Sequence, residues 1–193
     1  MSINDEYYFI GGSGEMNFIG HPKACYASLV EMADSQGYSN QKGFIENPQM
    51  TYYRFGKGSP LRYRLSDYSF ARCNTVVSKK IYNVLAPMNI HGVQFLPATV
   101  RGKWRKFKGQ YYVHVINEYD VIDESKSELD RSSVGFIMSI DKLVLNEEVL
   151  AAIPLEERLI FGTKGYSVKK LYHKTIVDRV MSINPKGIGF YKI

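Results

Sequence analysis

The sequence contains few cysteines, a single tryptophan and no long apolar run. Its two thiols, Cys25 and Cys73, are too few for a disulfide framework and lack the spacing of a metal site. A membrane-spanning helix needs about 20 consecutive apolar residues, and no stretch approaches that length. The N-terminal residues have neither the basic region nor the apolar core of a secretory signal. These absences favour a cytoplasmic protein without disulfides.

Recognisable catalytic signatures are also missing. The four histidines are scattered, without the H-x-x-x-H or H-E-x-x-H spacing of metal sites, and no G-x-S-x-G or Cys/His nucleophile motif is present. The Gly-rich segment 11–14 lacks the Lys-Ser/Thr pair of a phosphate-binding loop. We therefore expect a protein that is not an enzyme, with no catalytic residues, no metal site and no cofactor.

The remaining composition is that of a globular protein, with 45% hydrophobic residues and 15 tyrosines. Its net charge of +6 is distributed in blocks. Residues 57–117 contain eleven basic residues and one acidic residue, whereas residues 118–157 contain eleven acidic and three basic residues. Blocks of this size predict separate electropositive and electronegative patches on the folded protein.

The strongest β pattern lies at 111–116, where bulky residues alternate on both faces, as is typical of a central strand. This strand leads into an acidic, hydroxyl-rich turn that includes Asp120, Asp123 and Glu124. The spacing D-x-x-D-E matches no calcium loop. Because Asp and Ser side chains often cap turns, a structural turn is favoured over the paired carboxylates of a hydrolase.

Helical and extended patterns alternate along the chain. The spacing of apolar residues and caps predicts helices over 22–37, 74–88, 147–153 and 175–183. Runs rich in β-formers predict strands over 6–10, 51–55, 61–65, 91–97, 134–140, 159–161 and 187–191. We expect an α+β fold with a mixed or mostly antiparallel sheet packed by a few helices. We also expect residues 1–193 to form a single domain.

Two parts of the sequence are similar to each other. Residues 75–79 followed by 89–95 resemble residues 175–179 followed by 184–190, with unequal gaps between the two matched pieces. In both, a predicted helix leads through a turn into G-[VI]-x-F. Two copies are too few for a solenoid. The similarity fits a duplicated helix–strand unit, or two independent solutions to packing a helix on a sheet.

The most distinctive exposed segment is RGKWRKFK, residues 101–108. Its candidate partner-binding residues are Arg101, Lys103, Trp104, Arg105, Lys106, Phe107 and Lys108. Basic side chains bind phosphates and aromatic ones stack on bases, so a nucleic-acid-binding adaptor is one interpretation. Trp and Arg are also enriched at the centres of protein–protein interfaces. A solvated hairpin with Trp104 packed on the core is a third interpretation.

A series of short motifs runs through the second part of the chain in a fixed order. They are V-V-S-K at 76–79, G-V-x-F-L-P at 92–97, V-I-N-x-x-D-V-I-D-x-x-K-S at 115–127, I-F at 160–161, I-V-D-R at 176–179 and K-G-I-G-F at 186–190. In their order and spacing these motifs resemble bacterial polymorphic-toxin immunity proteins, in particular immunity family eleven. The resemblance covers about residues 74–193, residues 1–73 show none, and segment 101–108 is an insertion relative to the family pattern.

The resemblance implies a protein that binds a cognate antibacterial toxin and neutralises it by steric occlusion. It further implies delivery of the toxin through a type VI or contact-dependent secretion route. The expected partner is the toxin itself, rather than nucleic acid or a membrane. Such a function requires affinity and no chemistry, in agreement with the missing catalytic signatures.

Overall fold

Strands are the main regular structure in the computed structural model, which describes residues 2–11, 19–20, 26–32, 43–48, 50–55, 64–71, 74–101 and 106–193. The strands are β1 (Tyr7–Gly11), β2 (Ile19–Gly20), β3 (Tyr26–Met32), β4 (Thr51–Phe55), β5 (Arg64–Ala71), β6 (Asn74–Ser78), β7 (Val93–Arg101), β8 (Lys106–Val115), β9 (Glu118–Tyr119), β10 (Glu128–Arg131), β11 (Ile137–Lys142), β12 (Ile160–Thr163), β13 (Tyr166–His173) and β14 (Gly189–Lys192). The helices are α1 (Lys79–Leu85), α2 (Glu147–Ala151) and α3 (Lys174–Met181), with short 3-10 turns at Ile3–Glu6, Ala86–Met88 and Leu155–Glu157.

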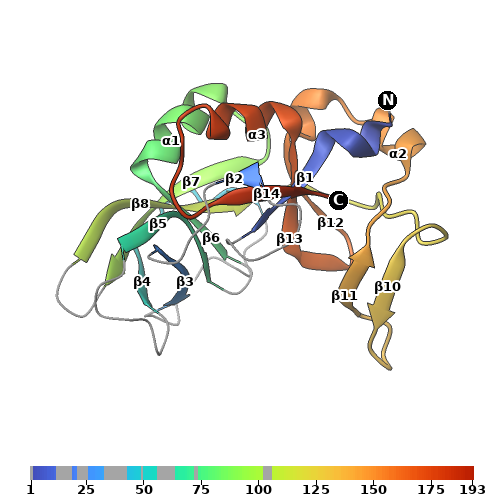
Figure 1. The fold of residues 1–193 in the computed structure, drawn as a ribbon, viewed down its shortest axis with the longest axis horizontal. Coiled ribbons are helices and arrows are strands. Elements are labelled where there is room, and N and C mark those ends of the chain that lie inside the picture. The colour runs from blue at the N-terminus through green and yellow to red at the C-terminus, as the bar shows by residue number, and fades with distance from the viewer. Residues whose placement is uncertain are drawn as a thin grey trace.

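The strands form three sheets (Figure 1). Six of them close into a barrel in the order β3-β4-β7-β8-β6-β5, with β5 returning to β3. A second sheet has the order β2-β14-β1-β13-β12-β9. Strands β10 and β11 form a separate two-stranded sheet that projects from the body opposite the barrel. Helices α1 and α3 lie side by side along one face of the molecule (Figure 1).

The two large sheets are built from equivalent units that exchange a strand. In each unit a β-hairpin leads into a helix, a loop and a further strand: β5–β6, α1 and β7 in the first, β12–β13, α3 and β14 in the second. Strand β1 precedes the first unit but lies between β13 and β14, antiparallel to both. Strand β8 precedes the second unit and lies between β6 and β7, again antiparallel to both. Each sheet therefore contains a central strand from the other half of the sequence.

The loops after α1 and α3 share an unusual backbone conformation. Asn89 and Gly92 have φ angles of 46° and 68°, and Asn184 and Gly187 have φ angles of 50° and 68°. This left-handed region is unfavourable for most residues, and Gly and Asn enter it most easily. The asparagine and glycine lie at the same spacing from the start of their helix in both units. The matching conformations favour a duplicated unit over two independent solutions.

Each loop is held by residues from the other half of the chain. The Asn117 side chain, just after β8, donates to the Glu157 carbonyl oxygen (2.9 Å) and lies 3.1 Å from His91 Nδ1 in the first loop. The Ser66 hydroxyl on β5 lies 2.8 Å from the Gly187 carbonyl oxygen, and the Asp67 carboxylate accepts from the Lys186 amide (2.7 Å). The polar groups of both turns are thus satisfied across the boundary between the units.

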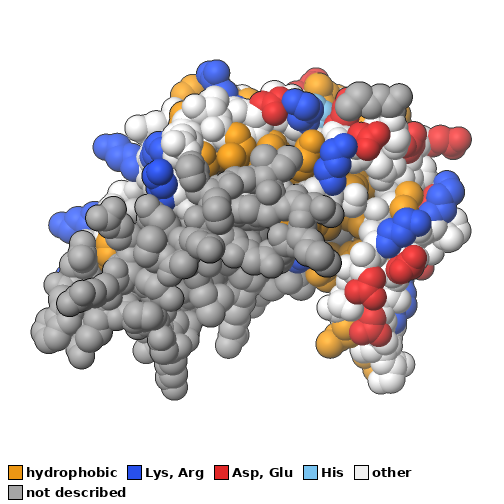
Figure 2. Space-filling model, in the orientation of Figure 1, with side chains coloured by type: hydrophobic (Ala, Val, Ile, Leu, Met, Phe, Trp, Pro, Cys, Tyr) orange, Lys and Arg blue, Asp and Glu red, His pale blue; other side chains and the backbone are white. Residues whose placement is uncertain are grey.

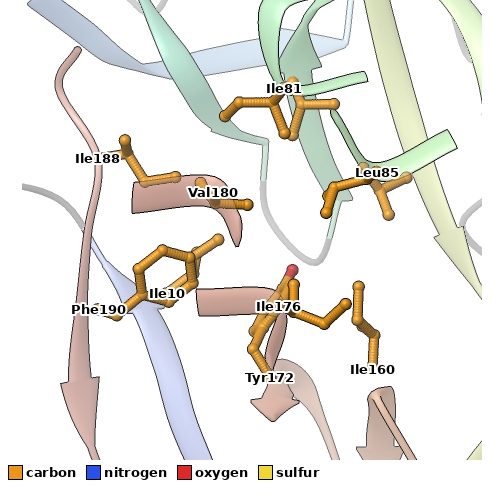
Figure 3. Close-up of a pocket in the computed structure, with 11 residues that line it drawn as sticks. Ile10, Ile81, Leu85, Ile160, Tyr172, Ile176, Val180, Ile188 and Phe190 are labelled. Carbon is orange, nitrogen blue, oxygen red and sulfur yellow. The ribbon is translucent and has the colours of Figure 1, made fainter. Parts of the chain in front are cut away.

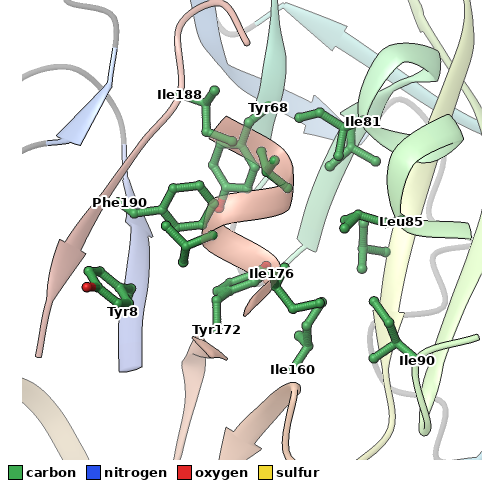
Figure 4. Close-up of a cluster of buried hydrophobic side chains, with 14 residues drawn as sticks. Tyr8, Tyr68, Ile81, Leu85, Ile90, Ile160, Tyr172, Ile176, Ile188 and Phe190 are labelled. Atoms are coloured by element: carbon green, nitrogen blue, oxygen red, sulfur yellow. The ribbon is translucent and has the colours of Figure 1, made fainter. Parts of the chain in front are cut away.

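The main hydrophobic core is shared by both units. Ile81 and Leu85 of α1 face Ile176 and Val180 of α3, and all four are buried. Figure 4 shows Ile81, Leu85 and Ile176 between the helices and the two sheets, together with aromatic residues from the strands. Tyr172 on β13 is fully enclosed there, and burial raises the pKa of its hydroxyl to about 12. The helices and sheets thus join through one apolar layer.

The α+β fold class expected from the sequence is confirmed, including the mixed sheets and the few helices. Two predicted helices are wrong in part. Residues 26–32, within the helix expected at 22–37, form strand β3, and residues 74–78, expected to begin a helix, form strand β6. The internal similarity at 75–79 and 175–179 therefore aligned a strand with a helix. Pairing Lys79 with Lys174, the first residue of each helix, removes the unequal gap.

Candidate functional site

The interior offers no room for a ligand at the junction of the units. A cavity of about 10 Å³ lies between α1, α3 and the sheets, and its walls are almost entirely apolar (Figure 3). Its lining includes Ile10, Ile81, Ile160, Ile176 and Phe190. A water molecule needs a space of at least about 10–15 Å³ and polar partners, so this cavity is a small packing defect between the helices and the sheets. The candidate sites therefore lie on the surface.

The described residues contain no candidate metal site. His, Cys, Asp and Glu side chains in these ranges form no cluster of three that could hold a metal ion. The buried His173 is used structurally, with its ring nitrogens 3.0 Å from Thr175 Oγ1 and 3.1 Å from Glu6 Oε2. His114 is also buried, and its Nε2 lies 2.9 Å from the Gly43 carbonyl oxygen.

The acidic turn after the central strand is built around Asp123. Its carboxylate accepts from the Ser125 amide (3.1 Å) and hydroxyl (2.6 Å) and pairs with Lys126 (2.9 Å). The hydrogen bond from Lys126, followed by that from Ser125, lowers the pKa of Asp123 below its ordinary 3.8. These contacts are those of a turn cap, as favoured from the sequence.

The lowered pKa of Asp123 predicts a pH response of this turn. Since the folded-state pKa lies below the unfolded value, the contribution of Asp123 to stability is present above about pH 3.8 and is lost as the pH falls through the folded-state pKa. The amide resonance of Ser125, followed by nitrogen–proton NMR, should therefore titrate with a midpoint below 3.8. In Asp123→Asn this titration should vanish. A midpoint above 3.8 would contradict the capping role.

The basic segment 101–108 lies at the turn between β7 and β8. Arg101 is paired with Lys106, and Val100 with Phe107, so the segment forms the end of a hairpin. The Arg101 guanidinium stacks over the Tyr52 ring, 4.5 Å from its centroid. Lys106 and Lys108 are exposed. Lys and Arg side chains gather at this end of the molecule in Figure 2, over α1 and β8.

Not all of the predicted contact residues are available for binding. Phe107 is half-buried and packs against Tyr53, Val76 and Val100 in the barrel core. It therefore does not supply an exposed ring on which a base could stack, which removes one aromatic from the nucleic-acid interpretation. Lys103, Trp104 and Arg105 lie outside the described residues.

A second exposed surface is the projecting hairpin β10–β11, residues 128–142, which we call the arm. Three large apolar residues close together at its tip are exposed: Val134 (75%), Phe136 (69%) and Met138 (64%). Phe136 directly precedes β11, and Met138 is the second residue of that strand. Figure 2 shows hydrophobic and acidic side chains next to each other on the arm.

The tip of the arm is an ordered turn. The Arg131 guanidinium donates to the Gly135 carbonyl oxygen (2.8 Å) and to the Glu124 carboxylate (2.7 Å). The Ser132 amide donates to the Phe136 carbonyl oxygen (2.8 Å), and the Phe136 amide donates back to the Ser132 hydroxyl (3.1 Å). Gly135 has a φ of 86°, which suits glycine at this point of the turn. The exposed apolar side chains are thus mounted on a defined backbone.

The base of the arm is fixed to the body. Just outside β10 and β11, the Val144 amide donates to the Ser127 hydroxyl (2.9 Å), which donates to the Val144 carbonyl oxygen (3.1 Å). The Asn4 side chain pairs with the backbone of Leu145, accepting from its amide (2.7 Å) and donating to its carbonyl oxygen (3.2 Å). Ile140, half-buried, packs against the adjacent core cluster. The arm is therefore held at a set angle to the second sheet.

The comparison with protein families decides the affiliation of the chain. Residues 16–193 match the model of an immunity protein family, Imm11. The chain belongs to this family. The match extends well before residue 74, so the resemblance seen in the sequence motifs also covers most of the N-terminal third. No curated protein matches the chain.

The family match gives the two exposed surfaces a candidate role in binding a partner protein. Members of an immunity family have a toxin as partner, and both the basic segment and the arm are surfaces that a protein could cover. None of the helices in the described part of the chain has the length and apolar character of a membrane span. The arm was not predicted as a contact surface, because residues 134–140 have the pattern of an ordinary strand. The available signal was the unbroken run of apolar residues at 134–138 inside the most acidic block.

Proposed function

We propose that this protein binds a cognate antibacterial toxin and neutralises it by steric occlusion. The observation that carries the proposal is the match of residues 16–193 to an immunity protein family. A steric mechanism is supported by a body in which two units share one core and exchange strands, because such a body keeps its shape when it covers a partner. The toxin would arrive through a type VI or contact-dependent secretion route and be met in the cytoplasm.

The first test is growth rescue. The toxin domain encoded by the adjacent gene is expressed from an inducible promoter, with or without this protein. We expect growth to stop without the immunity protein and to recover with it, and the two proteins to co-purify at a fixed stoichiometry. A neighbouring gene product that has no toxicity and does not bind would overturn the proposal.

We further propose that segment 101–108 forms part of the contact. Its exposed cations, Arg101, Lys106 and Lys108, lie at the end of a paired hairpin, where peripheral charge can attract an acidic patch on the toxin. Reversal of two of them in Lys106→Glu/Lys108→Glu should lower the association rate constant about tenfold at low salt, with a small effect on dissociation.

The control for this prediction uses the same charge reversal elsewhere. Lys79→Glu/Lys80→Glu changes two exposed lysines at the start of α1, near the same end of the molecule. If only overall charge matters, both pairs should slow association equally, and the effect should disappear as salt increases. An unchanged association rate for Lys106→Glu/Lys108→Glu at low salt would remove this segment from the interface.

A further inference from the structure

The arm is the main feature of the second unit that the repeated architecture does not explain. In the first unit β3, which follows β1 and β2, pairs in parallel with the hairpin strand β5, and in the second unit β9, which follows β8, pairs in parallel with the hairpin strand β12. Between these partners the first unit contributes β4, which closes the barrel. At the same place the second unit contributes β10 and β11, which pair only with each other among the described strands. The arm does not complete a sheet of the body.

The surface of the arm has the composition of a protein contact. Single exposed apolar side chains are ordinary on soluble proteins, but a contiguous group marks an interaction surface. Val134, Phe136 and Met138 are all exposed within one five-residue stretch of the arm, and aromatic residues and methionine are enriched at interfaces. The hydrogen-bonded turn beneath them means that little conformational entropy would be lost on binding.

The charges around this group indicate what kind of partner would cover it. Glu128 and Asp130 on β10 are exposed, and neither forms an ion pair with a described residue. They belong to the acidic block 118–157, with eleven acidic and three basic residues. A partner that buries the apolar group must come close to these carboxylates, and like charges there would weaken binding. The favoured partner surface is therefore an apolar pocket with Lys or Arg at its rim.

We propose that the arm anchors the toxin, with Phe136 and Met138 inserted into an apolar pocket that has a cationic rim. This inference rests on the proposed function and specifies where the strongest contact lies. It differs from the role proposed for segment 101–108, which lies at the opposite end of the long axis (Figure 1). A buried anchor controls mainly the dissociation rate, whereas peripheral charge controls mainly association.

The test measures binding kinetics with the purified, catalytically inactivated toxin domain encoded by the adjacent gene. Phe136→Ser/Met138→Ser should raise Kd by at least about 30-fold, mostly through faster dissociation. The matched control is Phe44→Ser, which removes an equally exposed aromatic (66%) from a segment beside β7, and it should leave Kd within about twofold. Since all three side chains are exposed, the variants should keep the wild-type circular dichroism and melting temperature.

The outcomes separate the two proposals. If wild-type protein neither binds the toxin domain nor rescues growth, the proposed function fails. If wild type binds and Phe136→Ser/Met138→Ser binds equally well, the arm is not the anchor and the proposed function stands. A second copy of this protein could bind the arm in place of the toxin, and sedimentation of the free protein tests this. If the wild type is a dimer, Phe136→Ser dissociates it and the affinity for the toxin is unchanged, then the arm mediates self-association and the inference is overturned.

The cationic rim has a test of its own. Glu128→Lys/Asp130→Lys should slow association with the toxin domain about tenfold at low salt, and the difference should shrink as ionic strength rises. Faster association in this variant would show an acidic rim and overturn that part of the inference.

Discussion

Two fragments produced by opening the chain within residues 102–105 are expected to remain unfolded when each is expressed alone, and to form a soluble complex when co-expressed. The opening separates β8 from β6 and β7, and at the same time separates β1 from β13 and β14. Each fragment therefore loses the central strand of its sheet. Exposed strand edges on both sides of that gap favour aggregation of the separate fragments.

The size of the effect follows from the side chains on β1. Tyr7, Tyr8 and Phe9 are 0, 6 and 7% exposed in the folded protein. Burial of a large apolar side chain stabilises by about 1.5–3 kcal/mol, so these three contribute roughly 5–9 kcal/mol. The total stability of a domain is only about 5–15 kcal/mol. The contribution of β1 is thus comparable with the whole stability of a domain, so we expect the second fragment to unfold without it, and the first fragment to unfold without β8.

A circular permutant serves as the control for the split protein. Its new ends lie at the same opening, and a short linker joins the old ends, which are close because Lys192 Nζ lies 3.3 Å from Asp5 Oδ1. Both units stay on one chain, so the permutant should fold and melt in a single transition. Circular dichroism and analytical sedimentation would detect the difference. A fragment that folds as a monomer on its own would show that the units are independent domains, contrary to the single domain expected from the sequence.

Local sequence patterns correctly predicted the strands and helices whose conformation does not depend on the neighbouring elements. Alternation of bulky residues at 111–116 placed β8 correctly as a strand paired on both sides. The spacing of Ile81 and Leu85 correctly indicated the buried face of α1. The pattern failed at 74–78, where an apolar spacing compatible with a helix continues through a run of β-branched residues. There the flanking strands β5 and β8 determine the extended conformation.

Local sequence patterns could not predict the strand exchange. The pairing of Tyr8 with Tyr172 joins residues from opposite ends of the chain, and no periodicity within either strand specifies it. The asparagine and glycine of the two turns were visible as a repeated motif, because their role is local. Their alignment became consistent only when Lys79 and Lys174 were seen to begin the two helices.

The arm shows a related limit for the candidate site. An apolar run predicts a strand, but it does not distinguish a face covered by the protein itself from one left for a partner. Ile137 and Met138 are successive residues of β11 and therefore point to opposite faces, of which only the Ile137 face is covered, because Ile137 is buried and Met138 is 64% exposed. In segment 101–108 the difference is the opposite. Its basic residues predict an exposed segment, but Phe107 within it packs against the barrel core. Both differences arise from tertiary packing.

The architecture separates scaffold from attachments. The repeated hairpin–helix–strand units supply the shared core and the reciprocal strand exchange, and the residues that hold their turns cross from one unit to the other. The two candidate contact surfaces lie at the hairpin β7–β8 and at the arm, at opposite ends of this scaffold. Substitutions in the scaffold should therefore change stability, and substitutions in the attachments should change affinity.

Gly92→Ala is expected to give the largest loss of stability from a single methyl group. Gly92 has a φ of 68°, and a Cβ at this position would lie 2.2 Å from the Asn117 side chain. The left-handed backbone costs about 1–3 kcal/mol for a residue other than glycine. The clash displaces Asn117 from Glu157 and His91, and each lost hydrogen bond costs about 1 kcal/mol. The total should be on the order of 3–5 kcal/mol, measured by urea denaturation.

Gly165→Ala is the matched control, because it isolates the backbone contribution. Gly165 has a φ of 81°, and the nearest atom to its added Cβ would be Ile137 Cδ1 at an ordinary 3.6 Å. This variant should lose only about 1–3 kcal/mol of stability.

The double variant Gly92→Ala/Asn117→Gly tests the clash directly, since it removes the side chain that the new methyl group meets. If most of the stability lost in Gly92→Ala comes from the displaced Asn117 side chain, Asn117→Gly alone should be strongly destabilising. Adding Gly92→Ala to Asn117→Gly should then lower the stability by little more than Gly165→Ala does in the wild type. An effect of Gly92→Ala no larger than that of Gly165→Ala would show that Asn117 moves aside without loss, and that the turn is not held as tightly as its contacts indicate.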